Sequence, residues 1–163
     1  MIVLKNNYNK NIPPIGSAKD GSPIPAAVNI SIILMKVVEI EEVDHSIHLQ
    51  FQISLQWKEP RATYQNLKKD TTLNALTVSD KNNIWLPRVV YENTDQKEVT
   101  RLGMPYEWDT TVAITREEES PKRSRIEVLD EIEYFQGSKN RLTMNQTYTK
   151  EFQCEYVLQR YPF

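Results

Sequence analysis

Residues 47–57 alternate without a break between apolar and polar side chains, and this alternation constrains the fold more than any other feature of the sequence. Successive side chains of a β-strand point to opposite faces of its sheet. The run therefore predicts a strand with one face on a core and the other on solvent or a partner. Its apolar members are Ile47, Leu49, Phe51, Ile53, Leu55 and Trp57.

Extended segments are predicted on both sides of this strand. Residues 28–43 are rich in β-branched side chains, and the short polar stretch 41–46 suits a hairpin connection. The only helical candidates are the first few residues and a turn near residues 62–70. Further short extended segments, separated by polar or Gly/Pro-containing turns, lie within residues 82–93, 109–117, 127–135, 141–152 and 154–161. This spacing indicates a single all-β domain, a sandwich or a barrel, over residues 1–163.

The composition excludes several classes of function. The formal net charge is -2, so there is no basic excess to bind nucleic acid. No apolar run approaches the roughly 20 residues that a membrane-spanning helix needs. His45 and His48 are the only histidines, and on a regular strand they face opposite ways. We therefore expect no metal site, no cofactor and no enzymatic activity.

The compartment is weakly indicated by two kinds of residue. Cys154 is the only cysteine, which fits either a reduced intracellular protein or a secreted protein that lacks the partner cysteine. The sequons that begin at Asn29 and Asn145 are glycosylation candidates. These two sequons favour the secretory route slightly.

Four stretches, taken in order, resemble the N-terminal part of the extracellular ligand-binding domain of the pentameric ligand-gated ion channels, the Cys-loop receptor family. They are the alternating strand ending at Trp57, then "IWLPRVVYEN", "RLTMNQTYTKEFQC" and "CEYVLQRYPF". The opening "YNKNIPPIG" also fits, so the resemblance covers nearly the whole chain. It implies an immunoglobulin-like β-sandwich and allows a short N-terminal helix.

The resemblance also gives a role to the last residues. In that family a cysteine is followed by six residues and then by an aromatic residue, proline and phenylalanine, as Cys154 is followed by Tyr161, Pro162 and Phe163. These residues would form the first half of the family's disulfide loop. The second cysteine and the last strands would then lie beyond Phe163, and the domain is expected to be incomplete and prone to self-association.

Some structural positions of the family can be matched individually. Trp57 corresponds to the buried tryptophan that ends the second strand, and Trp85 with Pro87 corresponds to a Trp-x-Pro-Asp motif. Arg88 stands where the family usually has the aspartate. This charge reversal predicts different local hydrogen bonds or an acidic partner, with Asp80 and Asp95 as candidates.

The ligand site of the family lies between subunits and is built from loops called A to F. Here Gln52 occupies the loop D position, and Glu92 occupies the loop A position beside Tyr91. An aromatic cage for a quaternary ammonium needs ring faces, so two polar residues argue against an acetylcholine-type ligand. A polar ligand, an amine held by Glu92, or no ligand at all remain as alternatives.

Loop E is expected in residues 141–149. Arg141, Thr143 and Asn145 alternate onto one face there and would present polar groups across an interface. An ordinary solvated strand face is the competing interpretation. A glycan on Asn145 would also compete with a role in ligand binding.

The resemblance implies the extracellular domain of a channel subunit in the plasma membrane. Such a subunit assembles as a homo- or hetero-pentamer, binds a small-molecule ligand that the sequence does not identify, and meets the membrane through a domain absent from this chain. A secreted, soluble pentameric binding protein of the same fold is the main alternative. An unrelated β-sandwich adhesion module is the third hypothesis.

Overall fold

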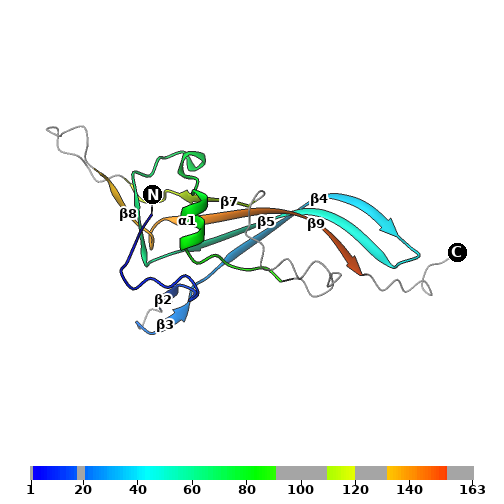
Figure 1. The fold of residues 1–163 in the computed structure, drawn as a ribbon, viewed down its shortest axis with the longest axis horizontal. Coiled ribbons are helices and arrows are strands. Elements are labelled where there is room, and N and C mark those ends of the chain that lie inside the picture. Colours follow the sequence, from blue (N-terminus) through cyan, green and yellow to red (C-terminus); the bar gives the residue numbers. More distant parts are fainter. Residues whose placement is uncertain (1, 18–20, 91–109, 120–131, 154–163) are drawn as a thin grey trace. The chain divides into compact units, whose positions relative to one another are not determined.

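The computed structural model describes residues 2–17, 21–90, 110–119 and 132–153, and nearly all regular structure in these ranges is β-strand (Figure 1). The strands are β1 (Ile2–Leu4), β2 (Ile15–Ser17), β3 (Pro23–Pro25), β4 (Asn29–Glu41), β5 (Ser46–Lys58), β6 (Ala62–Gln65), β7 (Thr110–Thr115), β8 (Tyr134–Gln136) and β9 (Arg141–Gln153). The helices are η1 (Thr71–Asn74), a 3-10 turn, and α1 (Val78–Asn83). The predicted all-β class is confirmed.

The described strands form three antiparallel sheets. The strand order is β1-β6-β8 in one sheet, β2-β3 in a second, and β4-β5-β9-β7 in the largest. The chain divides into two compact units, each described separately below. Unit 1 comprises Met1–Ile30, Ser54–Arg88 and Thr111–Asn145, and unit 2 comprises Ser31–Ile53, Val89–Thr110 and Gln146–Phe163.

The core of unit 1 is built mainly by residues that alternate along short strands. In the sheet β1-β6-β8, Tyr64 pairs with Phe135 across β6 and β8, and both side chains are completely buried. Trp57 of β5 is 1% exposed and meets Trp85 edge to face, with ring centroids 6.0 Å apart. Further buried side chains of this core are Leu55, Ala62, Leu67, Ile84, Val112, Ile114, Leu142 and Met144.

Unit 2 has a smaller apolar cluster among its described residues. Phe51 and Ile53 of β5 are buried there. The ring of Phe51 stacks on Tyr148, with centroids 5.7 Å apart, and lies 5.9 Å from the ring of Phe152. Tyr148 and Phe152 come from β9, so this cluster joins side chains of two neighbouring strands.

The predicted strand over residues 47–57 is confirmed as β5. Its apolar side chains from Phe51 onward are buried, whereas the polar residues between them are half-buried. Residues 42–45 connect β4 to β5 as a hairpin, and His45 adopts a positive φ of 51° there. The apolar side chains of β4 are the exception to the expected burial, because from Ile30 to Ile40 they are 45–64% exposed.

Two local expectations are wrong. Residues 2–4 form strand β1 and not a helix, because their backbone pairs with β6, with Ile2 opposite Tyr64 and Leu4 opposite Ala62. The segment 82–93 was expected to be a short extended segment, yet residues 82 and 83 end α1. The backbone of Ile84 is extended, residues 84–90 belong to no strand, and residues 91–93 lie outside the described ranges. A capping box between Thr77 and Asp80 nucleates this short helix.

The helical turn expected near residues 62–70 is also wrong for its first part. Residues 62–65 form strand β6, which is held between β1 and β8. The turn follows at Asn66, which has a positive φ of 55°. Pairing with two neighbouring strands therefore decides the conformation of this segment, because local propensity alone is a weak guide.

Candidate functional site

The predicted loop E residues lie on one face of β9, in unit 1. Arg141, Thr143 and Asn145 are half-buried, and the residues between them, Leu142 and Met144, are fully buried in the core. The expected alternation of a polar and an apolar face is thus confirmed. Since the core fixes the buried face, the polar row has one defined orientation.

Arg141 takes part in a charged cluster at the start of this row. Its Nη1 donates to Oε1 of Gln56 over 2.8 Å, and its Nη2 pairs with the carboxylate of Glu117. The same carboxylate pairs with Nζ of Lys58 at 3.3 Å. Burial acts to raise the pKa of Glu117, but hydrogen bonds and charge interactions with Lys58 and Arg141 outweigh it and lower that pKa.

Of the other predicted ligand-site residues, only Gln52 lies within the described ranges. Gln52 lies on β5 within unit 2 and is half-buried. Tyr91 and Glu92 lie outside the described residues. The role of these three positions therefore stays a prediction.

The structural motif positions differ in their burial. Trp57 and Pro87 are buried, and the backbone N–H of Trp85 donates to the hydroxyl of Tyr8 over 2.7 Å. Arg88 is exposed and forms no ion pair with any residue that the structure describes. Of its two candidate partners, Asp80 accepts hydrogen bonds from Thr77 in the capping box. The other, Asp95, lies outside the described ranges.

A buried acidic residue next to this motif was missed by the sequence reasoning. Glu59 is fully buried, and its two carboxylate oxygens accept from Nε and Nη2 of Arg61, each over 2.7 Å. The Tyr8 hydroxyl donates to the same carboxylate over 3.1 Å. The signal in the sequence was a Glu-Pro-Arg triplet directly after the alternating strand, since a planar guanidinium matches a carboxylate in a bidentate pair.

Two further contacts hold this Glu59 cluster together. The guanidinium of Arg61 lies 4.6 Å above the ring of Tyr8. Desolvation by burial is the main cause that raises the pKa of Tyr8 to about 12, so its hydroxyl remains a proton donor at neutral pH. Gly137 allows the backbone to approach, because a Cβ there would lie 2.1 Å from the carbonyl oxygen of Glu59.

The remaining predicted positions divide between described and undescribed parts of the chain. Asn29 is exposed as the first residue of β4, and Asn145 is half-buried in β9. Cys154, Tyr161, Pro162 and Phe163 lie outside the described residues.

Neither a metal centre nor a membrane span is found in the described ranges. No group of three or more histidine, cysteine, aspartate or glutamate side chains is arranged there to hold a metal ion. In the same ranges, no helix has the length and apolar character needed to cross a bilayer.

Antiparallel sheets, a buried Trp57 in edge-to-face contact with Trp85, and a row of polar side chains along β9 define an all-β domain. The whole chain, residues 1–163, matches the family model described as "Neurotransmitter-gated ion-channel ligand binding domain", and the chain belongs to this family. The family consists of ligand-gated ion channels and not of enzymes. Its members carry this domain on the extracellular side of a membrane channel. In general they bind small molecules and assemble as oligomeric channels.

One relative gives a closer comparison. Over 104 residues the chain is 24% identical to a glutamate-gated chloride channel of Drosophila melanogaster. The matched region covers 64% of this chain and 22% of that protein. The chain therefore aligns with about a fifth of the length of this relative.

Proposed function

We propose that this chain is the extracellular ligand-binding domain of a pentameric neurotransmitter-gated channel subunit, and that it binds a small ligand between neighbouring subunits. The observation that carries the proposal is the family match over residues 1–163. The polar row on β9 supports it, because a row fixed on a rigid strand presents its groups in a defined orientation to an adjoining subunit.

The ligand that we propose is small and polar. Gln52 and Thr143 offer neutral hydrogen-bonding groups, and Arg141 offers a cation. A guanidinium has five N–H donors, and Arg141 uses only part of them on Gln56 and Glu117. The Drosophila relative is gated by glutamate, so glutamate is the first ligand to test.

The proposed mechanism is a population shift. A ligand that binds one arrangement of the subunits more tightly than the other moves the equilibrium toward the open pore. We further propose that Cys154 belongs to the disulfide loop of the family and that Asn29 and Asn145 carry glycans. The parent protein would then lie in the plasma membrane with this domain outside the cell.

The test measures assembly and ligand binding on the same sample. The protein that carries this chain is expressed in animal cells, its mass is measured by native mass spectrometry, and glutamate binding is measured by calorimetry. We expect the mass of the assembly to equal that of five subunits. Gln52→Ala and Thr143→Val are each expected to weaken binding about five- to tenfold, as the loss of one hydrogen bond does.

A matched control separates ligand contact from a general effect of substitution. Gln153 is exposed at the end of β9, so Gln153→Ala is expected to leave the affinity for glutamate unchanged. A monomeric protein, or equal effects of Gln52→Ala and Gln153→Ala, would contradict the proposed interface. A pentamer whose coding sequence has no membrane domain would instead support the secreted binding protein.

A further inference from the structure

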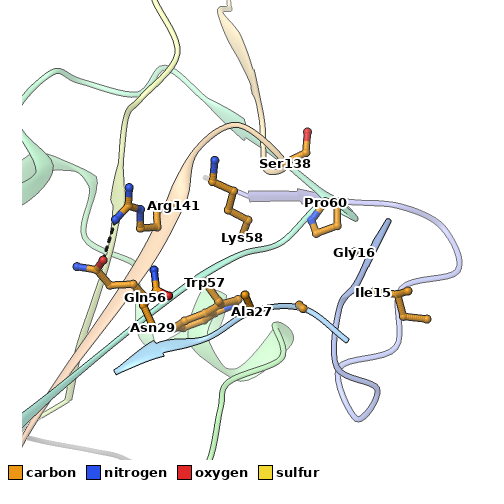
Figure 2. A pocket seen from close by; sticks show the side chains of 11 residues that line it. Ile15, Gly16, Ala27, Asn29, Gln56, Trp57, Lys58, Pro60, Ser138 and Arg141 are labelled. Carbon is orange, nitrogen blue, oxygen red and sulfur yellow. Dashed lines mark hydrogen bonds between the residues drawn. The ribbon is translucent and has the colours of Figure 1, made fainter. Parts of the chain in front are cut away.

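A cavity of about 450 Å³ lies within unit 1, and all its walls come from this one chain (Figure 2). It is bounded by residues of β2, by the start of β4, by the ends of β5 and β9 that lie next to each other, and by Ser138. Small-molecule sites in proteins commonly have volumes of roughly 300–1,000 Å³. The cavity therefore has the size of a ligand site without any contribution from a second subunit.

The lining of the cavity has two chemical characters. Ala27 and Pro60 give it apolar surface, and Trp57, which is 1% exposed, is also part of the lining. Lys58 and Arg141 give it two cationic side chains, and Figure 2 shows Arg141 bonded to Gln56 beside them. An apolar wall with a few convergent polar groups is the usual composition of a ligand site.

The charges at the cavity do not balance among the contacts described. Among the residues that the structure describes, Glu117 is the one carboxylate that pairs with both Lys58, at 3.3 Å, and Arg141. Within these residues, two cations that share one anion leave a surplus of one positive charge. The side chain of Lys58 is 47% exposed and that of Arg141 is 37% exposed, so both stay accessible to a second anion.

We propose that this cavity binds a small carboxylate with an apolar body, such as an arylalkanoate. The apolar body lies against Ala27 and Pro60, close to the buried Trp57, and the carboxylate pairs with Lys58 and Arg141. This site goes beyond the proposed function, because a ligand held between subunits needs two chains and this ligand needs one.

The test is a titration of the 163-residue chain with 3-phenylpropanoate, followed by NMR of the indole N–H groups. The chain has three tryptophans, and the resonance of Trp57 is assigned by elimination with Trp85→Phe and Trp108→Phe. Saturable shifts of the Trp57 resonance are expected, with a dissociation constant on the order of 1 mM for a ligand of this size. The uncharged analogue 3-phenylpropanamide is expected to bind at least about tenfold more weakly, because it lacks the charge-assisted hydrogen bonds.

Variants locate the bound molecule. Arg141→Gln and Lys58→Gln are each expected to weaken binding of 3-phenylpropanoate about five- to tenfold. Ala27→Phe fills the cavity and is expected to abolish saturable binding. Lys36→Gln removes the same charge from the exposed strand β4, outside the cavity lining, and is expected to change nothing.

Several results would overturn the proposal. Equal affinities for the amide and the carboxylate would be one such result, and unchanged binding of 3-phenylpropanoate to the Ala27→Phe variant would be another. So would a loss of affinity with Lys36→Gln as large as that with Lys58→Gln. The last is the absence of a saturable shift in a sample of the chain that still unfolds cooperatively. Asn29 also lines the cavity. If secreted protein carries a glycan on Asn29 and this glycan blocks the ligand, that result would equally count against the proposal. A ligand held between subunits needs two chains, whereas this titration uses the single 163-residue chain, so failure of the subunit-interface proposal leaves this test intact.

Discussion

The buried carboxylate of Glu59 is the centre of a hydrogen-bond cluster that connects three parts of unit 1 that are distant in the sequence. It accepts hydrogen bonds from Arg61 and Tyr8, and Tyr8 in turn accepts from the backbone of Trp85. A buried charge is stable only while its partners remain, because the bonds to them replace those to water. The cluster therefore links the start of the chain to the end of β5 and to the segment after α1.

Removing one partner of this cluster is expected to cost much of the protein's stability. Glu59→Ala leaves the guanidinium of Arg61, 23% exposed, without its bidentate partner. We expect the free energy of unfolding to fall by about 2–4 kcal/mol, measured by urea denaturation. Glu119→Ala, at an exposed position, is the matched control and is expected to stay within about 0.5 kcal/mol of the parent. Similar losses for both variants would mean that the buried pair has no special role.

Acid is expected to weaken the charged cluster around Glu117. Its pKa is lowered in the folded chain, so the stability that it contributes is present above the ordinary value of 4.5 and is lost as the pH falls through the folded pKa. Glu117→Gln cannot lose a charge in this range. We expect a shallower fall in melting temperature below about pH 4.5 for this variant than for the parent. Parallel curves would contradict this origin of the acid sensitivity.

At the level of elements, the sequence predicted the strands that carry strong alternation. The side-chain pattern indicates the buried faces of β5 and β9, and both strands were predicted near their observed bounds. β1 was missed because three residues contain too little pattern, and its conformation depends on pairing with β6. The Thr77–Asp80 capping box was visible in the sequence, but α1 is too short to show helical periodicity.

Strand β4 poses a distinct physical problem, because its apolar side chains are exposed in the structure. Ile32 is 64% exposed, and β4 lies at the end of the strand order in its sheet. Apolar side chains on an unpaired sheet edge favour association between chains. We therefore expect the apparent mass of the 163-residue chain to rise with concentration in light-scattering measurements.

A charge on this strand is expected to oppose that association. Ile32→Lys places a positive charge on the apolar surface and is expected to lower the apparent mass at every concentration. Val43→Lys makes the same change in the hairpin connection, where the side chain is already 91% exposed, and is expected to behave like the parent. A parent chain that stays monomeric at all concentrations would show that the β4 edge is not adhesive.

At the level of the whole molecule, the sequence predicted the family but only part of the candidate site. The order of four short motifs along the chain was enough to predict the family, and the family match over residues 1–163 confirms it. The polar row at Arg141 and Thr143 followed from alternation. The pairing of Arg141 with Glu117 did not, since it joins β9 to the residues that follow β7. Contacts with a second subunit are likewise beyond what one chain specifies.

The central claim is that this domain converts binding of a small ligand into opening of an ion pore. Voltage-clamp recording from cells that express the full coding sequence of the parent protein tests it most directly. We expect glutamate, or another small polar transmitter, to evoke a concentration-dependent current whose midpoint moves to higher concentration with Gln52→Ala. Protein that reaches the cell surface as a pentamer and passes no current with any such ligand would contradict the claim.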